Sequence, residues 1–540
     1  MFINRLVIKL ELKVGGKKFE IPAGNIKNFS VDHTCYGFTA SVDWWFVCLK
    51  SQSEDEIFAE FVKKDLVEAK LTVDRAYDKV GASTKPLVLQ GLVQDKRVLE
   101  RSFSDLAGEP VLHRRYTIRM ADRAAVLWRQ HRPVVLYVDK TLKDVVEDNK
   151  PKGLKVKHSW APLKAKHPVL SLGLGVPGSR ASFYDYVAWL LYTRHGGLFY
   201  DADKDEYELT DSKRSGATTK PNIEDVESLQ AHFPATIRHE VNVLNGWSES
   251  TVAKKTVANP DKVAGVRRDF LLVSPIAKDL DKRTTLETSR HKAAEPEAHL
   301  TFARFPSVTF KPSMIAEFTP DEGFSDKIYQ NKKKYRVYHL SIEAHAENQG
   351  AVDDDGYDSN SYEVEYRAEL EFKSEPNFRL PEFVAPTWPF PVEGKVVSDE
   401  GQSTEGTYQA YKNSGSSLEF YKVKVPLYKN QVVVVRFNPN LQNGHFYFPA
   451  YKDARVLLSL EFDRAWISRF LDWRPGARLP QNTQGNHILL GKKAKNETSI
   501  SHVYAEAKPK LKIERTYEKD NQIIEVSEGT ILLKTHESSK

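Results

Sequence analysis

Residues 471–540 of this 540-residue chain contain no helical pattern, and this segment most constrains the fold. Short strand-like runs recur at about ten-residue spacing, at 510–514, 522–526 and 530–534, with turn residues between them. Isolated short strands are marginally stable in water, and these are too few to enclose a core within one chain. The segment must therefore bury its apolar side chains against another surface, most simply against copies of itself about a cyclic axis.

The apolar side chains of these runs are the residues that we expect at the interface between copies. The predicted interface residues are Ile513, Ile523, Ile524, Val526, Ile531, Leu532 and Leu533. Without a partner, the last of these runs would leave an open strand edge.

The composition favours sheet over helix in the rest of the chain as well. The sequence has 27 Phe and 23 Tyr, and aromatic residues suit a pleated, half-buried surface. We therefore predict a mainly β protein with some α+β structure. The length accommodates three or four domains of ordinary size.

The charge and the cysteines narrow the class of protein. The net charge of +6, from 79 basic and 73 acidic residues, indicates a nearly balanced surface and no nucleic-acid partner. Two cysteines, Cys35 and Cys48, rule out a disulfide framework and suit assembly in a reducing cytoplasm. The first residues alternate as a strand would, and no run reaches the 18 or so apolar residues of a membrane helix.

Proline and glycine divide the chain. The Pro-rich junction from Pro381 to Pro391 cannot continue a helix, so we place a domain boundary there. The predicted domains are a strand-rich region over 1–385, a small β-barrel over 386–470, and a connector with a strand-only segment over 471–540.

Local patterns predict further features within 1–385. Ser182 caps a predicted helix over 183–194, and a hairpin follows to about residue 210. The apolar spacing within 54–67 predicts an amphipathic helix. The charged segment 282–299 and the acidic run 353–356 are interpreted as loops.

Catalytic and cofactor motifs fail on inspection. Gly173 to Gly178 satisfies G-x-G-x-x-G, but it lacks repeated βαβ units and contains Pro177. Asp201, Asp203 and Asp205 have calcium-loop spacing without the required Gly and Glu. The histidines are scattered without zinc-site spacing. We therefore expect no catalytic residue, no cofactor and no metal site.

Two rival functions stay open. One is a glycan hydrolase or dinucleotide enzyme with its active site within 150–375. The other is a carbohydrate-binding β protein, which would need Trp44, Trp45, Trp388 and Trp473 exposed for stacking on sugars. A cell-wall digestion assay distinguishes the first from a structural protein.

Two stretches carry a family resemblance. Residues 122–132, DRAAVLWRQHR, and 182–200, SFYDYVAWLLYTRHGGLFY, resemble the hub region of valine-glycine repeat (VgrG) spike proteins of type VI secretion and of contractile phage tail hubs. The resemblance extends over nearly the whole chain. It implies that 1–385 is a hub with two barrel-like β modules, that 386–470 is an oligosaccharide/oligonucleotide-binding (OB) type barrel, and that 471–540 is a connector with a short trimeric β-helical or β-prism needle. It leaves open a type VI spike, an extracellular injection-system spike or a phage hub, because 418–425 departs from the family's usual barrel stretch.

The resemblance also implies a function. Such a protein is a homotrimeric hub-spike that joins the baseplate and inner tube to the puncturing tip and is translocated when the sheath contracts. The implied partners are the inner-tube protein, baseplate subunits, a PAAR-like tip protein near Thr535 and effector cargo. The protein would be assembled in the cytoplasm and then exported with the particle, and none of its side chains would perform catalysis.

Overall fold

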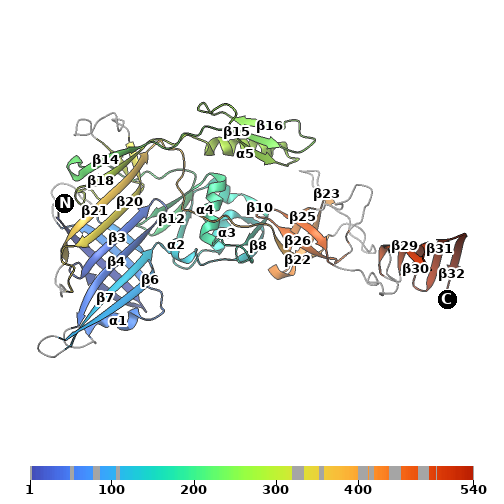
Figure 1. The fold of residues 1–540 in the computed structure, drawn as a ribbon, viewed down its shortest axis with the longest axis horizontal. Helices are drawn as coiled ribbons and strands as arrows, with labels where there is room; N and C mark the ends of the chain where they lie inside the picture. The colour runs from blue at the N-terminus through green and yellow to red at the C-terminus, as the bar shows by residue number, and fades with distance from the viewer. Residues whose placement is uncertain are drawn as a thin grey trace. The chain divides into compact units, whose positions relative to one another are not determined.

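A computed structural model describes residues 3–48, 54–76, 85–104, 110–318, 334–351, 358–398, 411–412, 419–436, 450, 452–471, 486–493 and 496–538. Strands dominate the described chain, so the predicted mainly β fold class is confirmed (Figure 1). The chain forms two compact units. The first comprises 1–133, 142–165 and 178–386, and the second comprises 134–141, 166–177 and 387–540.

A ring of eight strands forms the centre of the first unit. Each strand is hydrogen-bonded to the next, and the pairing of β20 with β21 closes the ring. In ring order the strands are β20 (Lys334–Ala346), β3 (Ile26–Thr34), β4 (Gly37–Cys48), β7 (Pro110–Ala121), β6 (Leu87–Ser104), β5 (Glu68–Arg75), β1 (Ile3–Val14) and β21 (Ser359–Phe372). Buried and more exposed residues alternate along β3 and β5, as expected for strands with one face in a core.

Five short strands extend this sheet beyond the ring. β2 pairs with β1, β19 and β13 follow β20, and β18 and β14 follow β21. Their bounds are β2 (Lys17–Pro22), β13 (Thr218–Thr219), β14 (Val226–His232), β18 (Glu297–Phe302) and β19 (Ile315–Glu317).

The core of this unit contains a buried aromatic cluster. The rings of Trp44 and Tyr116 stack with centroids 5.2 Å apart, and Phe61 packs edge-on against both. Phe61 ends α1 (Glu56–Phe61), whose first turn is capped by the Asp55 carboxylate. The helix predicted within 54–67 is therefore present, but shorter than the segment.

The predicted helix and hairpin are confirmed. Ser182 and Asp185 form a capping box at the start of α4 (Phe183–Arg194), and His195 ends the helix in the left-handed conformation. β11 (Gly197–Asp201) and β12 (Glu206–Thr210) form the hairpin. The neighbouring elements are α2 (Arg123–Leu127), α3 (Leu142–Asp148), β9 (Lys155–His158), the 3-10 helix η2 (Ala161–Lys164) and the 3-10 helix η3 (Ile223–Asp225).

The interpretation of 282–299 as a loop is wrong. Residues 277–290 form α5, and β18 begins at Glu297. The charged composition suggests a solvated loop. In the structure, however, Glu287 is buried and forms ion pairs with Arg283 and Arg290 one turn away on the same helix. α5 (Ala277–Arg290) lies beside a three-stranded sheet of β15 (Glu240–Asn245), β16 (Lys254–Val257) and β17 (Arg267–Leu272). The predicted loop over 353–356 lies outside the described residues.

The second unit contains a closed ring of five strands. The pairing of β22 with β24 closes it, in agreement with the predicted small barrel. In ring order the strands are β22 (Phe390–Val396), β26 (Arg455–Leu460), β27 (Ala465–Phe470), β25 (Gln431–Arg436) and β24 (Glu419–Val425), with β23 (Tyr411–Lys412) beside β24 and the 3-10 helix η4 (Pro426–Tyr428) after it. Its assignment as an OB fold stays a prediction.

A hairpin from earlier in the chain packs on this ring. β8 (Val134–Thr141) pairs with β10 (Lys166–Gly173), and Leu136 and Val169 are buried in the core of the ring. The second unit therefore includes segments from within the predicted 1–385 hub. The predicted domain boundaries stay a prediction.

The second unit ends in a five-stranded antiparallel meander, in which each strand pairs with the next along the chain. The strands are β28 (Asn486–Lys493), β29 (Asn496–Ala505), β30 (Lys508–Tyr517), β31 (Asp520–Ser527) and β32 (Thr530–His536). Across the described residues, no helix is both long and apolar enough to cross a membrane.

Candidate functional site

The five-stranded meander from β28 to β32, which we call the tail sheet, has a register that aligns apolar side chains in a row across it. Five residues, one from each strand, are direct neighbours in this row: Ile488, Ile500, Ile513, Ile524 and Leu533. A second row on the same side contains Leu511, Val526 and Ile531. Because residues two apart along a strand share a face, these rows form one surface, which we call the apolar tail face.

The apolar tail face is open to solvent. Ile531 and Leu533 are 72% and 73% exposed, and Ile524 and Val526 exceed 40%. Along β31 the residues of this face are the exposed ones, and their polar neighbours on the other face are less exposed. A soluble protein rarely leaves apolar side chains in contiguous rows unless they bind another surface. This face is the candidate functional site.

The opposite face of the tail sheet is polar. Lys510 pairs with Glu525 at 2.6 Å, and Lys512 pairs with Glu514 at 2.6 Å. Ion pairs that are partly exposed to solvent, as these are, add little to stability, but they suit a sheet face that contacts water. The tail sheet is therefore amphipathic, with one face suited to solvent and one suited to burial.

The seven predicted interface residues divide between the two faces. The apolar tail face contains five of them, namely Ile513, Ile524, Val526, Ile531 and Leu533. Ile523 and Leu532 lie on the polar face, where their cross-strand neighbours are charged. The prediction missed Ile488, Ile500 and Leu511, although the alternation of each strand would have separated the faces and located them.

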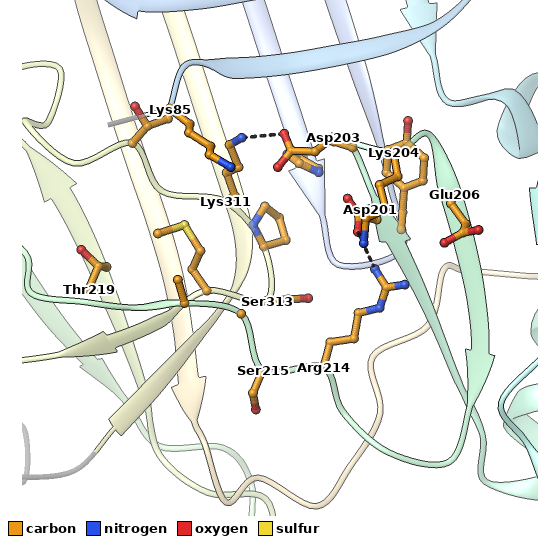
Figure 2. Close-up of a pocket in the computed structure, with 18 of the residues that line it drawn as sticks. Lys85, Asp201, Asp203, Lys204, Glu206, Arg214, Ser215, Thr219, Lys311 and Ser313 are labelled. Carbon is orange, nitrogen blue, oxygen red and sulfur yellow. Dashed lines mark hydrogen bonds and ion pairs between the residues drawn. The ribbon is translucent and has the colours of Figure 1, made fainter. Parts of the chain in front are cut away.

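The first unit contains a charged cavity of about 720 Å³ (Figure 2). The acidic turn between β11 and β12 forms part of its wall. Asp203 accepts a hydrogen bond from Lys311 at 2.7 Å, and Asp201 pairs with Arg214 at 3.5 Å. Asp205 pairs instead with Arg123 at 2.7 Å. The three carboxylates face three different cations, so they do not converge on a single calcium ion.

Two buried polar side chains also line this cavity. His33 is 2% exposed, and neither of its ring nitrogens has a hydrogen-bond partner within the described chain. Burial, together with the nearby charge of Lys311, lowers the pKa of His33 to about 3, so its ring is neutral at pH 7. The Ser313 hydroxyl is likewise without a described partner.

The G-x-G-x-x-G motif has a packing role at its first glycine. Gly173 ends β10, and a Cβ atom there would lie 2.4 Å from the Phe390 ring. β10 is antiparallel to its partner β8, so the motif does not join a βαβ unit. The glycine is needed for close packing.

The tryptophans proposed for sugar stacking do not form an exposed platform. Trp44 and Trp45 are buried at 1% and 7% exposure. Trp388 is partly buried against the core of the five-stranded ring. Trp473 lies outside the described residues. Trp44 and Trp45 therefore serve the core.

Comparison with known proteins gives structural matches. No protein-family model matches the sequence, and no curated protein matches it. A chain of the lidless PdpA–VgrG complex matches with a TM-score of 0.72 and 12% identity, over 99% of each chain. A chain of the lidded Francisella PdpA–VgrG complex matches with a TM-score of 0.74 and 12% identity, over 99% of this chain and 80% of that one. The protein therefore has the fold of these chains from PdpA–VgrG complexes.

One further solved structure matches the chain more weakly. The 43 kDa tail protein of prophage MuSo2 from Shewanella oneidensis aligns over 68% of this chain and 98% of its own, at 15% identity and a TM-score of 0.41.

Proposed function

We propose that this chain is a structural hub-spike subunit of a contractile injection apparatus and that it assembles as a homotrimer through the apolar tail face. The observation that carries the proposal is the apolar row from Ile488 to Leu533, which is exposed at Ile488, Ile524 and Leu533, on a sheet whose other side carries ion pairs. The shared fold with chains of PdpA–VgrG complexes supports the setting.

The energetics favour burial of this face. Each fully buried Ile, Leu or Val side chain contributes about 1.5–3 kcal/mol relative to exposure. Several such side chains per copy supply enough to offset the entropy lost on association. Three sheets that turn their apolar faces inward form a prism with the Lys and Glu rows outside.

The edges of the tail sheet favour the same assembly. β28 and β32 are the first and last strands of this sheet in the part of the chain that the structure describes. In a trimer, these edges approach the edges of neighbouring copies. The blunt end near Thr535 would then receive a conical, PAAR-like tip protein.

The further partners belong to the same proposal. The known complexes pair PdpA with VgrG, so we propose that this chain assembles with a spike-type partner as well. The first unit would serve as the hub, and we call it the hub unit. It would contact the inner-tube protein and baseplate subunits, and the particle would carry effector cargo. The subunit would be assembled in the cytoplasm, translocated on sheath contraction and free of catalytic activity.

The test is the mass of the protein in solution, measured by light scattering after size exclusion. We expect three times the mass of one chain. The double variant Ile524→Lys/Leu533→Lys should be monomeric, because it buries two charges in the interface. Removal of residues 510–540 should have the same effect.

A matched control uses the neighbouring residues. Ile523→Lys/Leu532→Lys makes the same two chemical changes one position along, on the polar face, and should stay trimeric. A wild-type protein that remains monomeric at high concentration would overturn the proposal, as would equal dissociation of both double variants.

A further inference from the structure

Three potential metal ligands meet at the edge of the large sheet in the hub unit. β14 is the last strand of this sheet and lies beside β18 (Figure 1). His232 of β14 is the direct cross-strand neighbour of Glu297 of β18, and His299 lies two residues further along β18 on the same face. Their ligand atoms all lie within 4.8 Å of one another.

The distances suit a tetrahedral ion. His232 Nδ1 and His299 Nε2 each lie 3.2 Å from Glu297 Oε2. Zinc bonds of about 2.0–2.2 Å in tetrahedral geometry place neighbouring ligand atoms ~3.3 Å apart. Charge-assisted hydrogen bonds between N and O are shorter, at about 2.7–2.9 Å. Both separations are longer than this and match the spacing of two ligands on one ion.

The carboxylate is held in position by other side chains. Glu297 is 9% exposed, its Oε1 pairs with Arg379, and its Oε2 accepts a hydrogen bond from Tyr338 at 2.9 Å. Glu297 is thus oriented by groups outside the ligand set, as metal-binding carboxylates are.

The two histidines complete the donor set without hindering access. The His232 side chain is 50% exposed, so solvent reaches the three ligand atoms. Two imidazoles and one carboxylate are the ligands of open zinc sites, in which water takes the fourth position.

We propose that His232 Nδ1, Glu297 Oε2 and His299 Nε2 bind a divalent transition metal ion, zinc by preference, at the edge of the hub sheet. The ion links β14 to β18 and fixes the last strand of the sheet. Arg379, on the other carboxylate oxygen, weakens the site by repulsion and orients the ligand at the same time.

The experiment uses the full-length protein after treatment with a chelator. Titration with Zn²⁺ in a calorimeter should give one ion per chain, and Co²⁺ should give the intense visible absorption of four-coordinate cobalt. Both signals should fall at least tenfold in His232→Ala and His299→Ala, because each variant removes one of three protein ligands.

The control is His345→Ala, since His345 lies on β20 of the same sheet and bonds to Asn28 at 2.7 Å. This variant should bind metal as the wild type does. Thermal unfolding without metal should match across the variants, which excludes misfolding as the cause of lost binding. Absence of heat and of cobalt absorption, or binding retained in both ligand variants, would overturn the proposal. The outcome is independent of trimer formation.

Discussion

At the scale of single residues, His339 on β20 forms ion pairs with carboxylates on both neighbouring strands of the eight-stranded ring. Its Nε2 lies 3.1 Å from Asp32 on β3, and its Nδ1 lies 3.3 Å from Glu369 on β21. Hydrogen bonds to these two carboxylates raise the pKa of His339 to about 9, and the bond to His339 lowers the pKa of Glu369 to about 2. The imidazolium is therefore the form that the fold binds.

The sign of the pH dependence follows from these pKa values. The contribution of His339 is fully present below pH 6.5 and is lost as pH rises through about 9, and that of Glu369 is lost as pH falls towards about 2. We expect His339→Gln to lower the free energy of unfolding by about 1–2 kcal/mol at pH 6 and by much less at pH 10. Urea unfolding at both pH values checks this, with His345→Gln as the control. An equal loss at both would contradict it.

At the scale of elements, Gly173 allows β10 to pack on β22. A Cβ atom at this position would lie 2.4 Å from the Phe390 ring, which is itself buried. We expect Gly173→Ala to destabilise the second unit by about 1–3 kcal/mol, since the core must shift to accept a methyl group. Urea unfolding, followed by hydrogen exchange in β10 and β22, measures the effect.

Gly178, from the same motif, is the comparison. A Cβ atom there would meet nothing within 4 Å, although its φ of +88° is strained for other residues. Gly178→Ala should therefore cost about 1 kcal/mol and leave hydrogen exchange in β10 unchanged. A larger loss at Gly178 than at Gly173 would contradict the packing role.

Local signals explain which elements the sequence predicts. The helix at 183–194 was predicted with its observed bounds because Ser182, Asp185 and the glycines after it define both ends. The sequence does not predict α5 because its buried Glu287 is paired with arginines on the same helix, and composition does not show such pairing. The apolar tail residues were found as a group, whereas their division between faces needs the register.

The cluster of His232, Glu297 and His299 could not be predicted from spacing. His232 and Glu297 are 65 residues apart along the chain, and only the antiparallel register of β14 with β18 makes them neighbours. Glu297 and His299 also lie within the segment that was interpreted as a loop. Zinc motifs recognised from sequence depend on closely spaced pairs of His or Cys, whereas the only closely spaced ligands in this cluster are Glu297 and His299.

At the scale of the whole molecule, the predicted trimer is joined by apolar contacts rather than by ion pairs. The Lys and Glu pairs of the tail lie on the polar face, away from the proposed interface. We expect 1 M NaCl to leave the trimer intact, because salt at this concentration screens charges beyond about 3 Å but does not weaken apolar burial. Analytical ultracentrifugation at low and high salt tests this, and dissociation in salt would contradict it.

The eight-stranded ring can close only late in synthesis, because two of its neighbouring strands lie far apart along the chain. β1, at the start of the chain, pairs with β21 at residues 359–372, so the ring stays open until the ribosome has added some 350 residues. At 5–20 residues per second, this wait is roughly 20–70 s. The N-terminal strands must spend that time with an unpaired edge, whereas each strand of the tail finds its neighbour as soon as it emerges. The nascent chain is therefore most prone to aggregation at its N-terminal strands, and a chaperone that binds strand edges would act there.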